Sequence, residues 1–101
     1  MTFTNWHTEV VCDQINNEEY LYTAKLKRFE LMRRFPFRRN ITASGAKTFA
    51  NHIGLLTYTQ QHDSDFRRSK VVWSEVAAFW MLEFGEWLSY ELEREAEQET
   101  A

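Results

Sequence analysis

Three tryptophans in the C-terminal part of the chain, Trp73, Trp80 and Trp87, follow one another at intervals of seven residues. Seven residues make about two turns of an α-helix, so on one continuous helix the three side chains share a face. Each indole buries about 150–250 Å² when it packs. Together with Phe84, the stripe predicts a long final helix that is either the core of a small domain or an oligomer interface.

Helix-breaking residues are scarce, with three Gly and one Pro among 101 residues. This composition favours helices joined by short loops over a sheet with many turns. A chain of this length forms one domain, which we place over residues 1–101. The expected fold is all-α, a small bundle of about four helices with the Trp-rich final helix in its centre.

Apolar residues at helical spacing place the first two helices. The first is expected over residues 5–16, and the second runs to about Phe35, where Pro36 stops it. Polar residues that can accept a hydrogen bond from the first turn mark where the two helices begin. The candidate N-caps are Thr4 or Asn5 for the first helix and Asn16 or Asn17 for the second.

A third helix is expected in the middle of the chain. Ser44 is a suitable N-cap, and the apolar spacing continues to about Leu56. Gly54 weakens this helix by about 1 kcal/mol relative to alanine. Residues 57–70 are mostly polar and predict a loop.

The final helix is expected over residues 75–97, after a short extended lead-in at residues 71–73 and an N-cap at Ser74. Its first half, residues 76–82, is apolar on nearly every side. Such a segment is central to a bundle or covered by another chain, and in so short a protein it predicts a homodimer. Seven apolar residues are far fewer than the ~20 that cross a bilayer, so we expect no membrane partner.

Charge is divided between two segments. Residues 25–39 carry seven basic side chains and one glutamate, a net charge of +6, whereas residues 75–99 carry eight glutamates and one arginine, a net charge of −7. In the simplest interpretation the two segments lie near each other and neutralise one another, within the chain or across a dimer. In the alternative interpretation each segment is a contact surface for a partner.

The basic segment supplies our candidate partner-binding residues. They are Lys27, Arg28, Arg33, Arg34, Arg38 and Arg39. An arginine side chain can make two parallel hydrogen bonds to a carboxylate or a phosphate, so both an acidic protein and a nucleic acid fit. The glutamates of the final helix would repel a phosphate backbone, and we therefore prefer a protein partner. Nucleic acid remains the alternative, because phenylalanines interleave with the basic residues.

Catalytic and metal-binding patterns are missing from the sequence. Cys12 is the only cysteine, so no disulfide forms within the chain, as is typical of a reducing cytoplasm. His7 lies five residues before Cys12 and off its helical face, so we expect Cys12 to be a core residue rather than a nucleophile. Glu83 and Glu86 are one turn apart, but no histidine partner follows them. We expect no enzyme, no cofactor and no metal.

Two blocks at the N-terminus resemble a family of short tailed-bacteriophage proteins. They are Asn-Trp-His-Thr-Glu-Val-Val at residues 5–11 and Ile-Asn-Asn-Glu-Glu-Tyr-Leu-Tyr at residues 15–22. Members open with Asn-Trp-Glu-Thr and an aliphatic run, followed by Ile-x-Asn-Asp-Glu and a Leu-Tyr pair. His7 replaces the acidic residue of that pattern. Residues 71–78 resemble a common family ending more loosely.

This family has no established activity to carry over. What the resemblance implies is a small phage accessory protein that modulates host machinery in the host cytoplasm. Our first hypothesis is an inhibitor that binds a host protein complex, as anti-CRISPR proteins do. The second is a nucleic-acid-binding accessory protein that uses residues 25–39. The third is a structural or assembly protein that oligomerises through the final helix.

Overall fold

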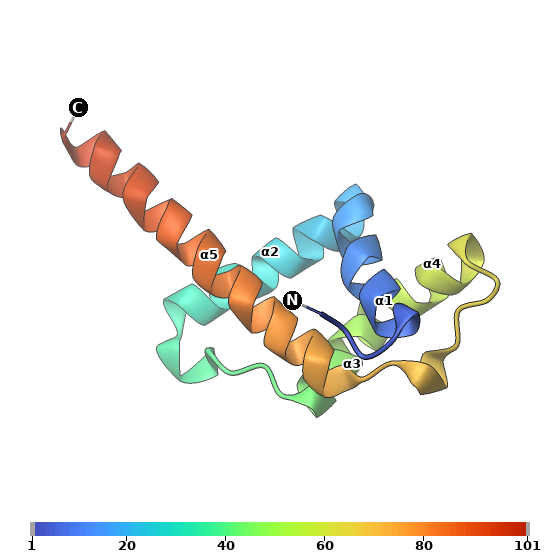
Figure 1. Cartoon of the computed structure of the whole chain (residues 1–101). Coiled ribbons are helices and arrows are strands. Elements are labelled where there is room, and N and C mark those ends of the chain that lie inside the picture. Colours follow the sequence, from blue (N-terminus) through green and yellow to red (C-terminus); the bar gives the residue numbers. More distant parts are fainter. Residues whose placement is uncertain (1, 101) are drawn as a thin grey trace.

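The computed structural model describes residues 2–100, and every regular element in that range is helical (Figure 1). The elements are α1 (Trp6–Asn17), α2 (Glu19–Arg34), the 3-10 turn η1 (Pro36–Arg38), α3 (Ala43–His52), α4 (Leu55–His62), the 3-10 turn η2 (Arg68–Lys70) and α5 (Trp73–Thr100). The predicted all-α class is therefore confirmed. The predicted number of four helices is wrong, because the described part contains five α-helices.

Helix α1 begins at the cap that the sequence predicts. The Asn5 side chain accepts a hydrogen bond from the backbone N–H of Thr8 at 2.9 Å. The buried Thr8 hydroxyl donates to the same Asn5 oxygen and accepts from the backbone N–H of Val72, also at 2.9 Å. This buried threonine therefore joins the first turn of α1 to the segment that leads into α5.

The junction between α1 and α2 differs from the prediction. Helix α1 extends to Asn17, and the N-cap of α2 is Glu18, whose side chain makes no capping hydrogen bond. The predicted caps at Asn16 and Asn17 are wrong. The reason lies in the long-range partners of Asn16, because its side-chain amide contacts Lys25 and Glu83 instead of a helix end.

The middle of the chain folds into two helices where one was expected. Thr42, rather than Ser44, caps α3. Its hydroxyl oxygen accepts a hydrogen bond from the backbone N–H of Gly45. Gly54 adopts a left-handed conformation with φ +77°, which breaks the helix, and α4 then starts at Leu55. The predicted single helix to Leu56 is therefore wrong. The predicted loop over residues 57–70 is wrong up to His62, where α4 ends, and holds for the residues after it, which contain only the short turn η2.

Helix α4 is stabilised by a narrow buried face that the polar composition hides. Leu55, Leu56 and Thr59 are buried. The Thr59 hydroxyl satisfies its hydrogen bond locally by donating to the Leu55 carbonyl at 2.8 Å. Buried threonine therefore behaves here as a small core residue on a helix face.

Helix α5 starts earlier than predicted. Trp73 is its first residue, so Ser74 lies in the first turn and is not the cap. The Val72 carbonyl accepts the first hydrogen bonds of the helix, from the N–H groups of Glu75 and Val76. The extended lead-in was predicted over residues 71–73, and only its first two residues precede the helix.

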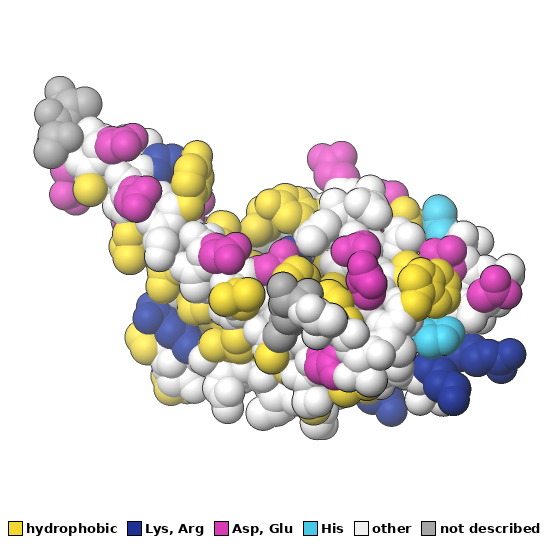
Figure 2. Space-filling view, in the orientation of Figure 1, with side chains coloured by type: hydrophobic (Ala, Val, Ile, Leu, Met, Phe, Trp, Pro, Cys, Tyr) yellow, Lys and Arg dark blue, Asp and Glu magenta, His cyan; other side chains and the backbone are white. Residues whose placement is uncertain are grey.

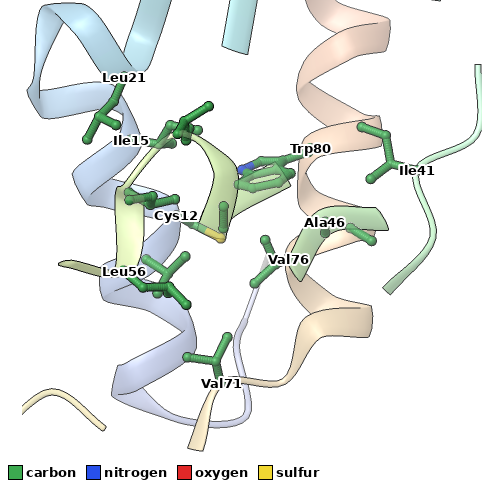
Figure 3. Close-up of a cluster of buried hydrophobic side chains, with 14 of the residues drawn as sticks. Cys12, Ile15, Leu21, Ile41, Ala46, Leu56, Val71, Val76 and Trp80 are labelled. Atoms are coloured by element: carbon green, nitrogen blue, oxygen red, sulfur yellow. The ribbon is translucent and has the colours of Figure 1, made fainter. Parts of the chain in front are cut away.

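The N-terminal half of α5 packs in the core between α1 and α3. Trp80 is 2% exposed, and Val76 and Phe84 are also buried. Figure 3 shows Trp80 and Val76 between Cys12 and Ile15 on one side and Ala46 on the other. The predicted placement of the Trp-rich helix at the centre of the domain therefore holds for this half of the helix.

The C-terminal half of α5 projects from the domain as an arm, which we define as residues 89–100 (Figure 1). The helix has 28 residues and is about 42 Å long. This length exceeds the 25 Å width of the molecule and accounts for most of its 50 Å long dimension, and the end of the helix extends beyond the other elements. Within residues 2–100, no helix is both long enough and apolar enough to cross a membrane.

Candidate partner-binding surface

The predicted aromatic stripe of α5 is mostly occupied within the chain. Trp80 and Phe84 are buried, whereas Trp73 and Trp87 are half-buried. The Trp87 ring lies 5.8 Å from the Phe29 ring of α2 and 6.0 Å from the Phe84 ring. The core interpretation of the stripe thus accounts for Trp80 and Phe84, and Trp87 packs on the edge of the same cluster.

The apolar run at residues 76–82 is also largely covered by the chain itself. The Phe3 ring packs edge-on against Phe79, with 5.4 Å between ring centroids. Ala78 and Leu82 are the members of the run that remain exposed. The run therefore leaves little apolar surface that needs a second chain, and the homodimer stays a prediction from the sequence.

The two oppositely charged segments meet within the molecule. Lys25 of α2 pairs with Glu83 of α5 at 3.1 Å. On the arm, Glu95 accepts hydrogen bonds at both carboxylate oxygens from one Arg33 nitrogen, at 2.5 and 2.7 Å, and this contact raises the pKa of Arg33. Both ion pairs therefore fit the simpler interpretation of the charge pattern, in which the two segments neutralise each other within the chain.

Arg39 has a structural contact as well. Its guanidinium donates to the backbone carbonyls of Met32 and Arg33, each at 2.9 Å, and lies over the Phe84 ring. These carbonyls belong to the last turn of α2, where no further helical N–H is present to pair with them. Arg39 thus closes the C-terminal end of α2, and we expect it to support the surface rather than to contact a partner.

The other candidate residues remain accessible. Lys27, Arg34 and Arg38 are exposed and Arg28 is half-buried, and the described chain supplies none of the four with a carboxylate partner. Lys27, Leu31 and Arg34 follow one another at spacings of four and three residues, so they share one outward face of α2. This face leads directly into η1.

Aromatic residues surround the basic ones where α2 ends. Phe37 is 80% exposed and Phe35 is 37% exposed, with their rings 5.9 Å apart. The Arg38 guanidinium lies over both rings, 5.6 Å from Phe35 and 5.7 Å from Phe37. We define Leu31, Arg34, Phe35, Phe37 and Arg38 as the α2–η1 corner.

Pro36 explains why this corner is exposed. The proline stops α2, and the chain turns through η1 without another element that covers the two phenylalanines. Figure 2 shows Lys or Arg side chains next to hydrophobic ones on the body below the arm. The binding residues expected from the sequence are all basic, and Leu31 is not among them. Leu31 could be recognised by its helical spacing from Lys27, which places both side chains on the same outward face of α2.

Several polar groups elsewhere make structural contacts. Burial raises the pKa of the Cys12 thiol to about 12, with Glu83 and Asp13 adding to the effect, which suits a core residue. Hydrogen bonds from Thr4 lower the pKa of Glu75. His7 Nδ1 accepts the backbone N–H of Arg67 at 3.1 Å. Among residues 2–100, no three His, Cys, Asp or Glu side chains gather in a way that could hold a metal ion.

In comparisons with known proteins, the chain matches no protein-family model, no curated protein sequence and no solved structure. Its function is therefore inferred from its own residues and geometry. The resemblance to the bacteriophage family stays a prediction from the sequence.

Proposed function

We propose that this chain is a non-enzymatic phage accessory protein that binds a host protein complex in the host cytoplasm and inhibits or modulates it, as anti-CRISPR proteins do. The α2–η1 corner is the surface that makes the contact. The observation that carries the proposal is the exposure of Phe37, together with the guanidinium of Arg38 that lies over its ring.

Exposed aromatic residues beside arginine are suited to protein recognition. A partner that covers Phe37 and Phe35 removes their apolar surface from water, and residues that dominate interfaces are enriched in large aromatics and arginine. The two rings also hold the Arg38 side chain in place before binding. Less side-chain freedom is then lost when the complex forms.

Charge defines the chemistry of the partner. Lys27, Arg34 and Arg38 present cations without a carboxylate partner in the described chain. A surface that places carboxylates around an apolar patch complements them and would be attracted over a distance of about 10 Å at moderate salt. We therefore propose an acidic, partly apolar protein surface as the target of the corner.

A nucleic-acid-binding accessory protein is the alternative, because bases can stack on exposed phenylalanines beside arginine. Against it, Arg33 at the end of α2 is already bound to Glu95, and further glutamates follow on the arm. The Glu95 carboxylate, held against Arg33 at the end of α2, would lie close to a phosphate backbone that reaches this end of the helix. A third alternative, assembly through the final helix, would use the arm and the exposed side of α5 around Leu82, since Trp80 and Phe84 are buried in the chain.

Capture of host proteins on matched variants tests the proposal. The corner variant combines Phe37→Ala with Arg38→Ala, and the control variant combines Leu82→Ala with Arg67→Ala, which are exposed elsewhere. Both should keep the melting temperature of the wild type, because exposed substitutions change stability by less than about 0.5 kcal/mol. We expect quantitative mass spectrometry of a bacterial host lysate to show proteins retained by the wild type and the control but lost from the corner variant.

Two results would contradict this function. One is retention of the same proteins by the corner variant as by the wild type. The other is binding of random duplex DNA by the purified wild type, with an affinity that falls steeply as salt rises, because that dependence is the mark of phosphate contacts. The second result would favour the nucleic-acid alternative.

A further inference from the structure

A groove of about 440 Å³ lies between α2 and α5, where the arm leaves the body. Its walls are aromatic, with Tyr22 from α2 facing Trp87 and Tyr90 from α5, and Lys25, Glu83 and Glu86 are its charged lining residues. Figure 2 shows an open hollow between the arm and the body with hydrophobic side chains on both sides. The volume falls in the range of protein ligand sites.

The positive charge of Lys25 is already used within the groove. Lys25 is 3% exposed, and its ammonium binds Glu83 at 3.1 Å and the side-chain oxygen of Asn16. The same ammonium lies over the rings of Tyr22 and Phe29. Lys25 therefore neutralises Glu83 and has little left to offer an incoming anion.

Glu86 gives the groove a net negative charge. Its side chain is exposed, and the described chain places no cation against it. The same face of α5 continues through Tyr90 to Glu93, about 10 Å further along the helix, which is also exposed and unpaired in the described chain. Carboxylates and aromatic rings thus alternate from the groove onto the arm. In addition, Glu83 Oε1 is buried and accepts no hydrogen bond from residues 2–100.

We propose that this groove binds an arginine or lysine side chain of a protein partner. The cation lies against the faces of Trp87 and Tyr90, where aromatic rings attract positive charge, and pairs with the carboxylate of Glu86. Glu93 accommodates a second basic residue of the same segment. The site differs from the α2–η1 corner in its residues and in the sign of its charge, so it does not depend on the proposed function of that corner.

The lining excludes the other classes of ligand. An anion would meet Glu86 and Glu93, while a purely apolar segment would cover Glu86 without a charge to pair with it. A second copy of this chain could present Lys27 or Arg34, and the oligomeric state distinguishes that occupant from a separate partner. Charge complementarity therefore selects a basic protein segment.

Two synthetic peptides test the site, one of repeated Leu-Arg-Ala triplets and one of repeated Leu-Gln-Ala triplets. Binding is followed by NMR of the tryptophan indole N–H resonances. We expect the arginine peptide to shift Trp87 and leave buried Trp80 unchanged, and the glutamine peptide to shift neither. Tyr90→Leu and Glu86→Gln should each weaken binding about two- to five-fold, the range that one exposed cation–π or ion-pair contact gives.

Glu99→Gln is the matched control, because it changes the net charge equally at the far end of the arm. It should bind the arginine peptide as the wild type does. Equal binding of both peptides, equal weakening by Glu99→Gln, or unchanged binding by both groove variants would overturn the proposal. A wild type that sediments as a dimer and becomes monomeric with Glu86→Gln would also overturn it, because the occupant would then be a second copy.

Discussion

Lys25 and Glu83 form an ion pair across the α2–α5 contact, with 3.1 Å between Nζ and Oε2 and with the lysine side chain 4% exposed. Removing one partner of a buried pair leaves the other charge without compensation, which costs about 3–5 kcal/mol. We expect Lys25→Met to approach the lower end of that range, because the Glu83 side chain keeps 20% exposure to water. Urea denaturation of the variant gives the free energy of unfolding.

The double variant Lys25→Met with Glu83→Leu is the control for this pair. An apolar replacement of both partners removes the uncompensated charge, so it should recover much of the loss seen with Lys25→Met alone. If the two substitutions instead add without recovery, the pair does not interact in the way the geometry indicates.

Trp80 is the member of the tryptophan stripe on which the core depends most. It is 2% exposed, and its ring packs edge-on against Phe49 at 5.8 Å between centroids. We expect Trp80→Ala to destabilise the protein by about 3–5 kcal/mol, because it leaves a large cavity. Leu82→Ala on the exposed side of the same helix should change stability by less than about 0.5 kcal/mol. Equal melting temperatures for Trp80→Ala and the wild type would show that the indole is not buried.

The sequence predicts those features of the fold that are determined by residues close together in the chain. The cap at Asn5, the stop before Pro36 and the long final helix follow from residue type and spacing within one or two turns. At Gly54 the sequence predicts only a weakened helix, because a glycine in a helical pattern does not reveal the left-handed backbone that breaks the helix there. Helix α4 was missed because Leu55 and Leu56 are followed by polar residues.

The candidate surface was predicted only in part, because a charge pattern does not show which charges pair. Arg34 and Arg38 are accessible as expected, whereas Arg33 binds Glu95 and Arg39 binds the end of α2. The partner of Arg33 is 62 residues away in the chain. Such a contact depends on how α2 and α5 pack, and helical periodicity within one segment carries no information about it.

Two glycines give opposite predictions for the same substitution. Gly54 has φ +77°, a conformation that costs a residue with a Cβ about 1–2 kcal/mol, so Gly54→Ala should destabilise the protein. Gly85 lies inside α5, and a Cβ there would meet no atom within 4 Å. Gly85→Ala should therefore stabilise the protein by about 0.5–1 kcal/mol through helix propensity.

Thermal unfolding of the two glycine variants checks both signs in one experiment. A lower melting temperature for Gly54→Ala and a higher one for Gly85→Ala are the expected results. Stabilisation by Gly54→Ala would mean that residues around it continue as one helix, as the sequence alone suggested. Destabilisation by Gly85→Ala would mean that this position of α5 is covered, for example by a second chain.

The buried Cys12 thiol should make the folded protein less stable in alkaline solution. Burial raises the pKa of its thiol from 9.0 to about 12 in the folded protein. Between these values the unfolded chain releases the proton while the folded chain keeps it, so the unfolded state binds fewer protons and stability falls as pH rises. The expected slope is about 1.4 kcal/mol per pH unit above pH ~9. Below pH ~9 both states keep the proton, and this contribution is fully present.

The comparison with Cys12→Ala isolates the thiol from the lysines and tyrosines that titrate in the same range. The variant lacks the buried sulfur, so its stability differs from that of the wild type at every pH. The informative quantity is how the difference in unfolding free energy between the wild type and Cys12→Ala changes with pH. That difference should shift against the wild type by about 1.6 kcal/mol between pH ~9 and pH ~10.5, because the unfolded thiol is already half ionised at pH ~9. A constant difference over this range would show that the thiol ionises in the folded state and that Cys12 is reachable by water. Rapid labelling of the native protein by a thiol reagent would support the same conclusion, because only an accessible thiolate reacts quickly.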